Sequence, residues 1–322
     1  MKSTTNYPAP TDAKPGVLQV VATGPQVSAV VVSFHPDLSK LGRLLEVLAS
    51  QCQQIIVVDN GSATCVTDWL LLHSCPVPYQ VLLLGSNQGI AAAQNHGIRR
   101  AVCNESQYVI LFDHDSCPAP GMVAELLAVL NTQQAAGHLV AGVGPRFQDA
   151  RQKSHLPFIQ RVGWRTLRHS CTGPEVAVPV DYLISSGCLI PAMALREVGL
   201  MEESLFIDYV DIEWGLRAQS KGYRSFGACR AHMEHDLGDT PIRLMGYNFP
   251  LHSPLRHYYM FRNAVWLYRQ PFIGIRWRLL DSWQLLLKYG FYTLFAKPRF
   301  AHWWHMSKGV LHGLRGRMGR VR

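Results

Sequence analysis

Over the first 145 residues, continuous apolar runs alternate with segments in which apolar residues recur at helical spacing. The runs that end in polar residues are VSAVVVSF (27–34), QIIVVDNGS (54–62), YQVLLLGSNQG (79–89) and YVILFDHDS (108–116). Unbroken apolar runs of this length are typical of strands buried on both faces of a sheet. Leu residues at helical spacing predict a helix over 38–51, with Asp37 as its N-cap. Further helices are predicted over 90–102 and 120–131, and a fifth strand over 139–145.

This alternation predicts an α/β fold with a parallel sheet flanked by helices. Ligands of such sheets bind beyond the carboxyl ends of the strands. A largely polar cluster follows each of the four strands. The residues of these clusters are Ser33, Phe34, His35, Asp59, Asn60, Gly61, Asn87, Gln88, Gly89, Asp113, His114 and Asp115. Because these ends share one rim, we expect a ligand site there. The simpler alternative is that loops are polar wherever they lie.

The second half of the chain has a less regular pattern up to residue 180. A strand is predicted over 181–191, followed by a short helix that ends at Val198. A longer helix is predicted over 206–222, with several acids near its first turns. A last strand over 223–235 leads to two histidines, and the chain beyond it is helical in period.

Charge is distributed unevenly along the chain, which carries +9 overall. We expect a flexible leader over 1–26, a catalytic unit over 27–250 with halves at 27–145 and 146–250, and a helical region over 251–322. The helical region holds thirteen Lys and Arg against one acid, and five of the eight Trp. Basic and aromatic side chains together indicate a phosphate-rich partner, either an anionic membrane surface or nucleic acid. The remaining 250 residues are slightly acidic, which disfavours nucleic acid as the main partner.

The eight cysteines are scattered and form neither a CxxC pair nor a zinc-ligand spacing. The first 26 residues lack the apolar segment of a signal peptide. We therefore expect reduced, mostly buried thiols in a cytoplasmic protein. No apolar run reaches the roughly 18 residues of a membrane-spanning helix.

Two aspartates one residue apart, Asp113 and Asp115, carry the clearest chemical signal. Carboxylates in this arrangement suit Mg²⁺ or Mn²⁺, which complete their coordination with water and substrate phosphates. Such a cation would neutralise a diphosphate leaving group. Neither a GxGxxG fingerprint, a P-loop nor a GxSxG elbow is present. The DxD spacing alone arises often by chance, but its place at the fourth of four aligned strand ends makes it specific.

Other residues extend this chemistry. Asp59 is suited to accept the N–H of a pyrimidine, and Gly89 opens a helix whose backbone N–H groups suit a phosphate. A second acid would deprotonate an attacking hydroxyl, and Asp211 is the candidate. His235 is either a further metal ligand or a structural histidine.

The order of several segments resembles that of the family 2 inverting glycosyltransferases. The segments are VVVSFHPDLSKLGRLLEVLASQ, IIVVDNGS, SNQGIAAAQNHGIRRA and ILFDHDS. The motif FDHDS and the later segments DYLISSGCLI, LFIDYVDIEWGLRAQ and LRHYYMFRN are similar to those of the bacterial dTDP-rhamnosyltransferases in that family. The resemblance covers about residues 27–265. It implies a GT-A fold, which is a Rossmann-like, mainly parallel sheet flanked by helices.

The resemblance implies a nucleotide site made of Ser33, Phe34, His35, Asp59, Asn60, Gly61, Asn87, Gln88, Gly89, Asn95, Asp113 and His114. It implies metal ligands at Asp113, Asp115 and His235, with Asp115 as the more direct one.

The catalytic base implied by the resemblance is Asp211. The family has a second acid directly before its base, but this chain has Val210 there. Asp208 and Glu213 therefore remain alternative bases.

The acceptor and sugar pocket implied by the resemblance contains Ser185, Ser186, Gly187, Trp214, Arg256 and Arg262. Two alternatives stay open. The small residues of 185–187 also suit a turn, and the arginines also suit an amphipathic helix whose charges are solvated.

These observations predict a metal-dependent inverting glycosyltransferase. The resemblance implies transfer of L-rhamnose from dTDP-β-L-rhamnose to a hydroxyl of a saccharide or lipid-linked acceptor, in the synthesis of O-antigen or another surface glycan or glycolipid. The alternatives are a UDP- or GDP-sugar donor, or a basic binding protein without transferase activity. Region 251–322 suits peripheral contact with the cytoplasmic face of the inner membrane, core packing or a homo-oligomer interface equally well.

Overall fold

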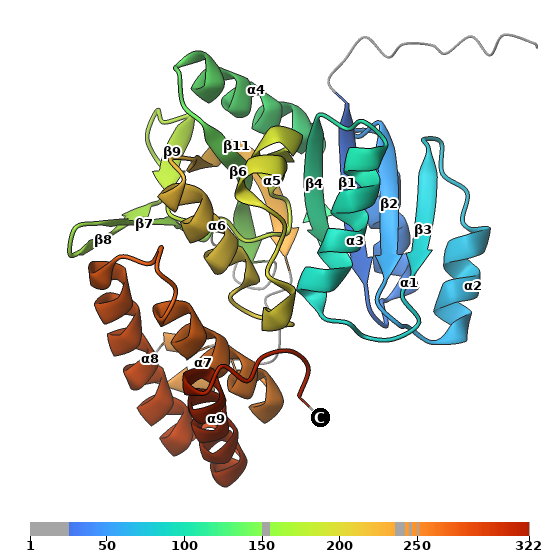
Figure 1. Ribbon diagram of the computed structural model, residues 1–322. Coiled ribbons are helices and arrows are strands. Elements are labelled where there is room, and N and C mark those ends of the chain that lie inside the picture. The colour runs from blue at the N-terminus through green and yellow to red at the C-terminus, as the bar shows by residue number, and fades with distance from the viewer. Residues whose placement is uncertain (1–25, 150–154, 236–241, 245–246, 250, 322) are drawn as a thin grey trace, which may run out of the picture.

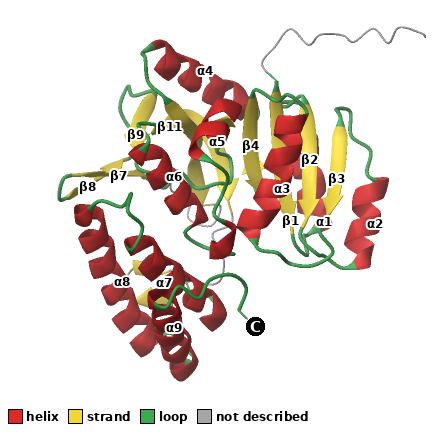
Figure 2. Ribbon diagram, viewed as in Figure 1, coloured by secondary structure: helices red, strands yellow, loops and turns green. Residues whose placement is uncertain are grey.

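The computed structural model describes residues 26–149, 155–235, 242–244, 247–249 and 251–321 (Figure 1). Its main sheet has nine strands, and eight of them follow the order β3-β2-β1-β4-β10-β6-β11-β5. Helices cover both faces of this sheet, and three further helices form a separate layer at its lower edge in the view shown (Figure 2). The expected α/β architecture is confirmed.

The four predicted strands of the first half form one parallel block. They are β1 (Val27–Ser33), β2 (Gln54–Asp59), β3 (Tyr79–Leu83) and β4 (Tyr108–Asp113). In the register, Ser33 lies opposite Asp59 and Val32 lies opposite Asp113. The carboxyl ends of these strands are therefore level at one rim, as the sequence predicts.

The second half of the sheet is mixed. Its strands are β5 (Cys117–Pro118), β6 (Val140–Asp149), β9 (Ala177–Val180), β10 (Leu189–Pro191) and β11 (Arg224–His235). Strand β10 is antiparallel to both β4 and β6, whereas β6 and β11 are parallel to each other. Strands β6 and β11 therefore end at the same rim as the first four strands. Two separate hairpins pair β7 (Phe158–Val162) with β8 (Arg165–His169), and β12 (Ile242–Leu244) with β13 (Tyr247–Phe249).

Six helices pack along the sheet. They are α1 (Leu38–Ala49), α2 (Thr64–Leu72), α3 (Ile90–Cys103), α4 (Met122–Ala135), α5 (Ala192–Val198) and α6 (Val210–Ser220). Helices α1 and α4 share one apolar core, and α3, α5 and α6 share the core on the opposite face. Asp37 caps α1 as predicted, because its carboxylate accepts from the backbone N–H groups of Ser39 and Lys40.

The C-terminal region consists of α7 (Pro254–Tyr268), α8 (Ile275–Phe295) and α9 (Arg299–Leu314). Helices α7 and α9 lie against each other at two glycines of α9. A Cβ at Gly309 would lie 2.4 Å from the carbonyl oxygen of Tyr258, and one at Gly313 would lie 2.5 Å from that of Arg262. The absence of a side chain at both positions allows this close approach.

Two predicted elements are shorter in the structure than the sequence indicates. The strand predicted over 181–191 contains only Leu189–Pro191, and the preceding residues form a loop. The helix predicted over 206–222 begins at Val210, because Asp208 and Tyr209 adopt positive φ angles of 64° and 66°. This backbone conformation is incompatible with a continuing right-handed helix.

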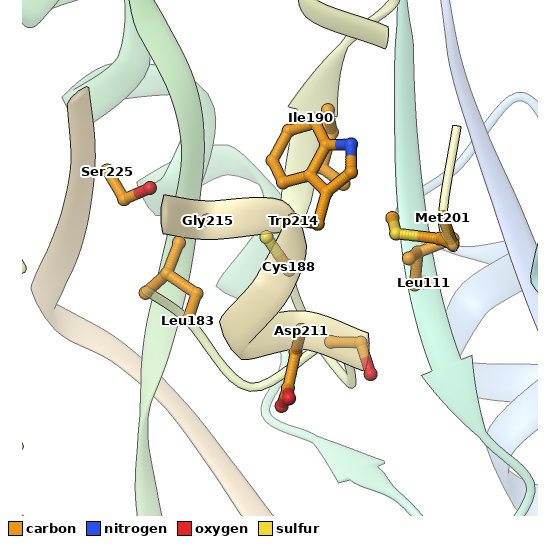
Figure 3. Close-up of a pocket in the computed structure, with 10 residues that line it drawn as sticks. Leu111, Leu183, Cys188, Ile190, Met201, Asp211, Trp214, Gly215 and Ser225 are labelled. Carbon is orange, nitrogen blue, oxygen red and sulfur yellow. The ribbon is translucent and has the colours of Figure 1, made fainter. Parts of the chain in front are cut away.

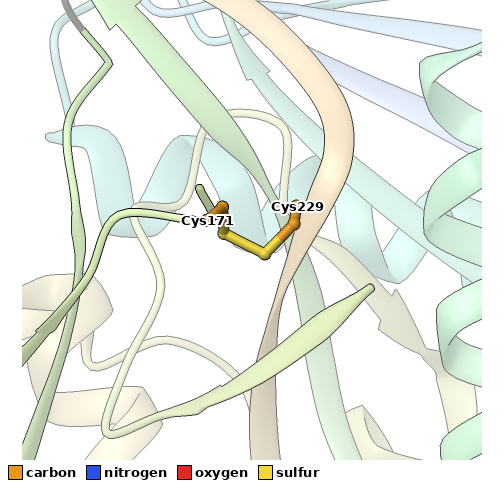
Figure 4. The surroundings of a disulfide bond; sticks show 2 residues. All are labelled: Cys171 and Cys229. Atoms are coloured by element: carbon orange, nitrogen blue, oxygen red, sulfur yellow. A yellow bond between two sulfur atoms is a disulfide. The ribbon is translucent and has the colours of Figure 1, made fainter. Parts of the chain in front are cut away.

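The expectation for the cysteines is wrong in two respects. Cys171 and Cys229 form a disulfide, with their Cα atoms 5.4 Å apart (Figure 4). Strand β9 pairs with β11 and draws the segment before it towards Cys229, a proximity that a separation of 58 residues does not reveal. Of the six free cysteines, Cys52 and Cys188 are buried, whereas three others are exposed.

No helix within the described ranges is long and apolar enough to cross a bilayer. This agrees with the absence of a sufficiently long apolar run in the sequence.

Candidate active site

The ends of β1 and β2 are joined by a buried carboxylate. Asp59 accepts hydrogen bonds from the Ser33 hydroxyl (3.0 Å) and the Ser62 backbone N–H (2.9 Å), one on each oxygen. The Ser62 hydroxyl accepts in turn from the backbone N–H of His35 (2.8 Å). Asp59 therefore orders the loops at this rim, and a pyrimidine N–H would have to share an oxygen that is already in use. Phe34 lies beside these loops with 38% of its surface exposed, and its ring contacts that of His35 in a tilted arrangement.

Two asparagines connect the loops after β2 and β3. The Asn60 side chain donates to Asn87 Oδ1 (3.2 Å) and accepts from the backbone N–H of Gln88 (2.8 Å). Asn87 Oδ1 also accepts from the Gly89 N–H (2.9 Å). Gly61 has a φ of 88°, and a Cβ there would lie 2.6 Å from the Ser86 backbone. The predicted nucleotide loops are therefore held together by their own side chains.

The start of α3 differs from the expected open phosphate site. Gly89 has a φ of 90°, and a Cβ there would meet the carbonyl oxygen of Phe206 at 2.5 Å. That oxygen accepts from the first N–H of the helix, at Ile90 (2.7 Å). Because the N–H groups of 88–90 already have partners, a phosphate at this helix end would compete with internal hydrogen bonds.

The DxD turn follows β4 and is tied to the loop before β10. Asp113 and Asp115 are half-buried, as is His114 between them. The backbone N–H of Asp113 donates to the Ser186 hydroxyl (3.2 Å), and the hydroxyls of Ser186 and Ser116 are 2.6 Å apart. Ser186 is thus a support for the turn that carries the two carboxylates. Ser185 lines the small cavity beside α6.

The two DxD carboxylates fit a divalent cation of the magnesium type. No cluster of three or more acidic, histidine or cysteine ligands occurs among the residues that the structure describes. Mg²⁺ needs no such cage, since it commonly takes one or two carboxylates and completes its shell with water and phosphate oxygens. The predicted third ligand, His235, is the last residue of β11, and its side chain lies outside the described part of the structure.

Asp211 lies in the first turn of α6, beside a cavity of ≈ 20 Å³ (Figure 3). Leu111, Leu183 and Trp214 are among the mostly apolar residues around this cavity. Burial raises the pKa of Asp211 to about 6, and the negative charges of Asp208 and Asp113 act in the same direction. Ser185 lines the same cavity, and its neighbour Ser186 bonds to the DxD turn, so this turn lies near Asp211. A carboxylate with a pKa near neutrality is suited to general-base work.

The first alternative base, Asp208, is held by an arginine. Arg256 donates from Nε and Nη2 to Asp208 Oδ1 at 3.2 and 3.1 Å. The Asp208 side chain is only 13% exposed. The guanidinium of Arg256 therefore occupies the carboxylate that an acceptor hydroxyl would have to approach.

The second alternative base, Glu213, has a structural role. Its two oxygens accept from Arg217 at 2.7 and 2.9 Å, and its side chain is 3% exposed. Arg217 also donates to the carbonyl oxygens of Val198 and Leu200, so the pair fastens α6 to the end of α5. These contacts leave Asp211 as the strongest of the three candidates.

Three predicted site residues are buried, and of these Trp214 still lines the cavity beside Asp211. Asn95 is 1% exposed and bonds to Met201 through both its amide oxygen and its amide nitrogen. Trp214 is 5% exposed and donates to the Gly199 carbonyl oxygen (2.8 Å). Arg262 is fully buried. The sequence did not distinguish these from rim residues because polar and aromatic side chains also serve inside a fold.

The buried Arg262 joins α7 to the segment before α6. Its guanidinium donates to the carbonyl oxygen of Leu205 (2.9 Å) and also to that of Gly319, and it lies over the Tyr259 ring. Arg262 therefore packs within the protein and does not face an acceptor. Its charge is compensated by carbonyl groups and not by solvent, unlike the solvated charge expected for an amphipathic helix. Arg256 contacts Asp208 and remains partly exposed.

One residue at the nucleotide loops was not predicted. Arg320 donates to the Asn87 carbonyl oxygen at 3.2 Å. The segment after α9 returns to the sheet, and Gly319 N donates to the Ser204 carbonyl oxygen (2.7 Å). Only the tertiary structure brings this residue to the rim, since it is 233 positions away from Asn87.

Comparison with known proteins identifies the family. Residues 28–194 match Glycosyl transferase family 2. The chain belongs to glycosyltransferase family 2. A relative of this glycosyltransferase, "dTDP-rhamnosyl transferase RfbF" of Shigella flexneri, is 32% identical over 295 residues, which cover 91% of the present chain and 96% of that protein.

Solved structures support the GT-A fold of this family 2 enzyme. The crystal structure of S. aureus TarS 1-349 matches with a TM-score of 0.56 and 13% identity, over 91% of this chain and 82% of that one. GalNAc-T7 with UDP, GalNAc and Mn²⁺ matches with a TM-score of 0.55 and 13% identity. The latter match covers 91% of this chain but 56% of that longer one. At these identities the likeness shows the fold alone.

Proposed function

We propose that this enzyme is a metal-dependent inverting rhamnosyltransferase. It moves L-rhamnose from dTDP-β-L-rhamnose to a hydroxyl of a saccharide or lipid-linked acceptor in bacterial surface glycan or glycolipid synthesis, for example of O-antigen. The choice of donor rests on the similarity to a dTDP-rhamnosyl transferase over nine-tenths of the chain. The observation that carries the chemistry is the Asp211 carboxylate, which has a raised pKa and lines a cavity with Ser185, next to the serine that bonds to the DxD turn.

In the proposed reaction, Asp211 removes the proton from the acceptor hydroxyl. The hydroxyl oxygen forms a bond to the anomeric carbon while the bond from that carbon to the diphosphate oxygen breaks. The proton stays on Asp211, and the electron pair leaves with the nucleoside diphosphate. Because attack and departure occur on opposite faces of the sugar, the configuration inverts. The raised pKa of Asp211 suits this proton transfer.

Asp113 and Asp115 would hold the divalent cation at the leaving-group side. A bound Mg²⁺ or Mn²⁺ supplies positive charge that stabilises the departing diphosphate. Ser186 and Ser116 keep this turn in place through their mutual hydrogen bond. In this proposal Asp113 and Asp115 bind the metal, and Asp211 carries out the proton transfer.

A panel of nucleotide sugars tests the donor. With Mg²⁺ present, we expect hydrolysis or transfer with dTDP-rhamnose and at least about tenfold lower rates with UDP- and GDP-sugars, since a base pocket discriminates through specific hydrogen bonds. Release of dTDP, UDP or GDP is measured by chromatography. Turnover of a UDP- or GDP-sugar with none of dTDP-rhamnose would contradict the donor assignment and leave the transferase assignment intact.

The surface of α8 and α9 supports a peripheral membrane contact. The exposed apolar residues on α8 recur along one face at helical spacing, and they are Ile275, Leu279, Trp283, Leu286, Leu287 and Leu294. Helix α9 adds Phe300, Trp303, Trp304, Leu311 and Leu314. Apolar stripes of this extent are characteristic of interfacial helices.

The positive charge of this surface favours an anionic membrane as its partner. Lys297 and Arg299 are exposed where α8 is joined to α9, between Leu294 and Phe300 of the two stripes. Asp281, the single acid after residue 250, is turned inward and pairs with Arg161 at 3.1 Å. The exposed face therefore presents positive charge that negative lipid headgroups attract. We place the enzyme in the cytoplasm at the inner face of the membrane on this basis, and nucleic acid is not part of the proposal.

Vesicle flotation tests the membrane contact. We expect the enzyme to float with vesicles containing phosphatidylglycerol, and the double variant Leu286→Glu/Phe300→Glu to remain unbound, because it adds negative charge to both stripes. Leu72→Glu is the matched control, since Leu72 is 85% exposed on α2, remote from both stripes. Point variants are preferable to removal of α9, whose glycines pack on α7. Unchanged flotation of the double variant, or its loss of self-association instead, would contradict the proposal.

A further inference from the structure

Three basic side chains gather where β6 and β11 run side by side. Arg146 lies opposite His232 in the register of these strands, and the His155 ring contacts that of His232 in a tilted arrangement with centroids 5.4 Å apart. The positive charges of Arg146 and His232 add to burial in lowering the pKa of His155. We call these three residues the basic cluster.

The register places the basic cluster at the active-site rim. Leu189 of β10 pairs with Ile110 of β4 and with Val143 of β6. Strands β4 and β6 are parallel, Asp113 lies three residues after Ile110, and Arg146 lies three residues after Val143. The two residues are therefore level along the strand direction. They are two strand positions apart, which corresponds to about 10 Å.

The basic cluster also lies on the face of the sheet that carries Asp211. Phe147 and Met233 follow Arg146 and His232 directly, and both belong to the core shared with α1 and α4. Successive side chains of a strand point to opposite faces. Arg146 and His232 therefore point towards the face covered by α6.

The basic cluster contains three nitrogen atoms without hydrogen-bond partners. These are Arg146 Nε, His155 Nδ1 and His232 Nδ1, each of which is inaccessible to solvent and unpaired among the residues that the structure describes. A buried donor without a partner costs free energy, and its need is met when a ligand occupies the site. These groups suit an oxyanion, because arginine is a donor only and even a neutral histidine carries one N–H that can donate to it.

We propose that the basic cluster binds a phosphoryl group at the active-site rim. The ligand is a diphosphate, carried either by the nucleotide donor or by a lipid-linked acceptor. This inference rests on the proposed function for the identity of the diphosphate-bearing substrates. It assigns to Arg146 and His232 a binding role distinct from the metal and proton-transfer roles of the acids.

Calorimetric titrations of Arg146→Gln and His232→Gln test the proposal. The first ligand is dTDP with Mg²⁺, and the second is farnesyl diphosphate added to enzyme saturated with dTDP. We expect each variant to bind one of these diphosphates at least about tenfold more weakly, as for the loss of a charge-assisted hydrogen bond. A loss confined to dTDP assigns the cluster to the donor, and a loss confined to farnesyl diphosphate assigns it to the acceptor. Arg146→Lys is expected to restore part of the affinity.

Two controls make the result decisive. Arg230→Gln changes an exposed arginine of the same strand and should leave both affinities within twofold of the wild type. Circular dichroism verifies that each variant is folded. If both folded variants bind both diphosphates as tightly as the wild type, the proposal is wrong. If the wild-type enzyme binds neither dTDP nor dTDP-rhamnose but binds inorganic pyrophosphate through the cluster, the proposed function fails while the anion site stands.

Discussion

Asp211→Asn is expected to lower the turnover number of sugar transfer by about 10³-fold while donor affinity stays within twofold of the wild type. The amide keeps the size of the side chain but does not accept the acceptor proton, and general-base catalysis contributes roughly 10²–10⁴-fold. Initial-rate kinetics with dTDP-rhamnose and titration with dTDP separate the two quantities. A variant that retains more than a tenth of the wild-type turnover would contradict the assignment of the base.

The pH dependence follows from the raised pKa of Asp211. The base acts only when ionised, and its pKa is about 6 in the folded protein. We therefore expect kcat/KM of the wild type to fall about tenfold for each pH unit below 6. The control Asp68→Asn changes an exposed acid on α2 and should leave the profile unchanged.

Asp211→Asn is also expected to stabilise the folded protein. The pKa of Asp211 lies above the ordinary aspartate value of 3.8, so the folded state holds this proton more tightly than the unfolded chain. Protonation of Asp211 therefore stabilises the folded protein fully below about pH 4, and this stabilisation is lost as the pH rises through 6. Ionised Asp211 thus costs up to about 3 kcal/mol at pH 8. Urea unfolding of Asp211→Asn should show this gain at pH 8 and little difference at pH 4.

The alternative bases provide discriminating variants for these measurements. Glu213→Gln should lower the free energy of unfolding by about 3 kcal/mol, because it leaves Arg217 without its buried partner. Asp208→Asn should release Arg256 and change the turnover number less than Asp211→Asn does. If Asp208→Asn instead abolished turnover in a folded protein, the base would be Asp208.

Asp115→Ala is expected to abolish the metal dependence of nucleotide binding. Wild-type affinity for dTDP should rise on addition of Mg²⁺ or Mn²⁺, because the cation joins the carboxylates to the diphosphate. In the variant, we expect dTDP affinity with Mg²⁺ to fall at least about tenfold, to the value measured in EDTA. Titration calorimetry with and without EDTA measures both states.

The two acidic variants should therefore fail in different ways. Asp115→Ala loses metal-dependent binding, whereas Asp211→Asn keeps it and loses turnover. Thymidine, which lacks phosphates, serves as the control ligand because its affinity should be independent of metal in both proteins. Equal affinities of Asp115→Ala and the wild type for dTDP with Mg²⁺ would contradict the role of this carboxylate.

The sequence by itself determined the first half of the fold and the rim at which we expect the site. Unbroken apolar runs identified β1, β2 and β4, because a strand buried on both faces needs apolar side chains along its length, and a similar run identified the half-buried edge strand β3. The polar residues after each run then marked one rim, since parallel strands end on the same side. The order of these segments also indicated the glycosyltransferase family, which the comparisons confirm.

Tertiary structure decided which of the candidate residues reach the rim. Asn95 and Arg262 have the side chains of a binding site but satisfy their hydrogen bonds inside the fold, whereas the buried Trp214 lines the cavity beside Asp211. Pairing with Arg256 and Arg217 sets Asp208 and Glu213 apart from Asp211, and neither pairing follows from spacing alone.

Contacts between distant segments decided the remaining features. The Cys171–Cys229 disulfide, the bond from Arg320 to Asn87 and the basic cluster all join segments far apart in the chain. Local patterns report which face of an element is buried, because that depends on neighbours three or four positions away. They do not report which elements meet, and that depends on how the sheet and the helices pack as a whole.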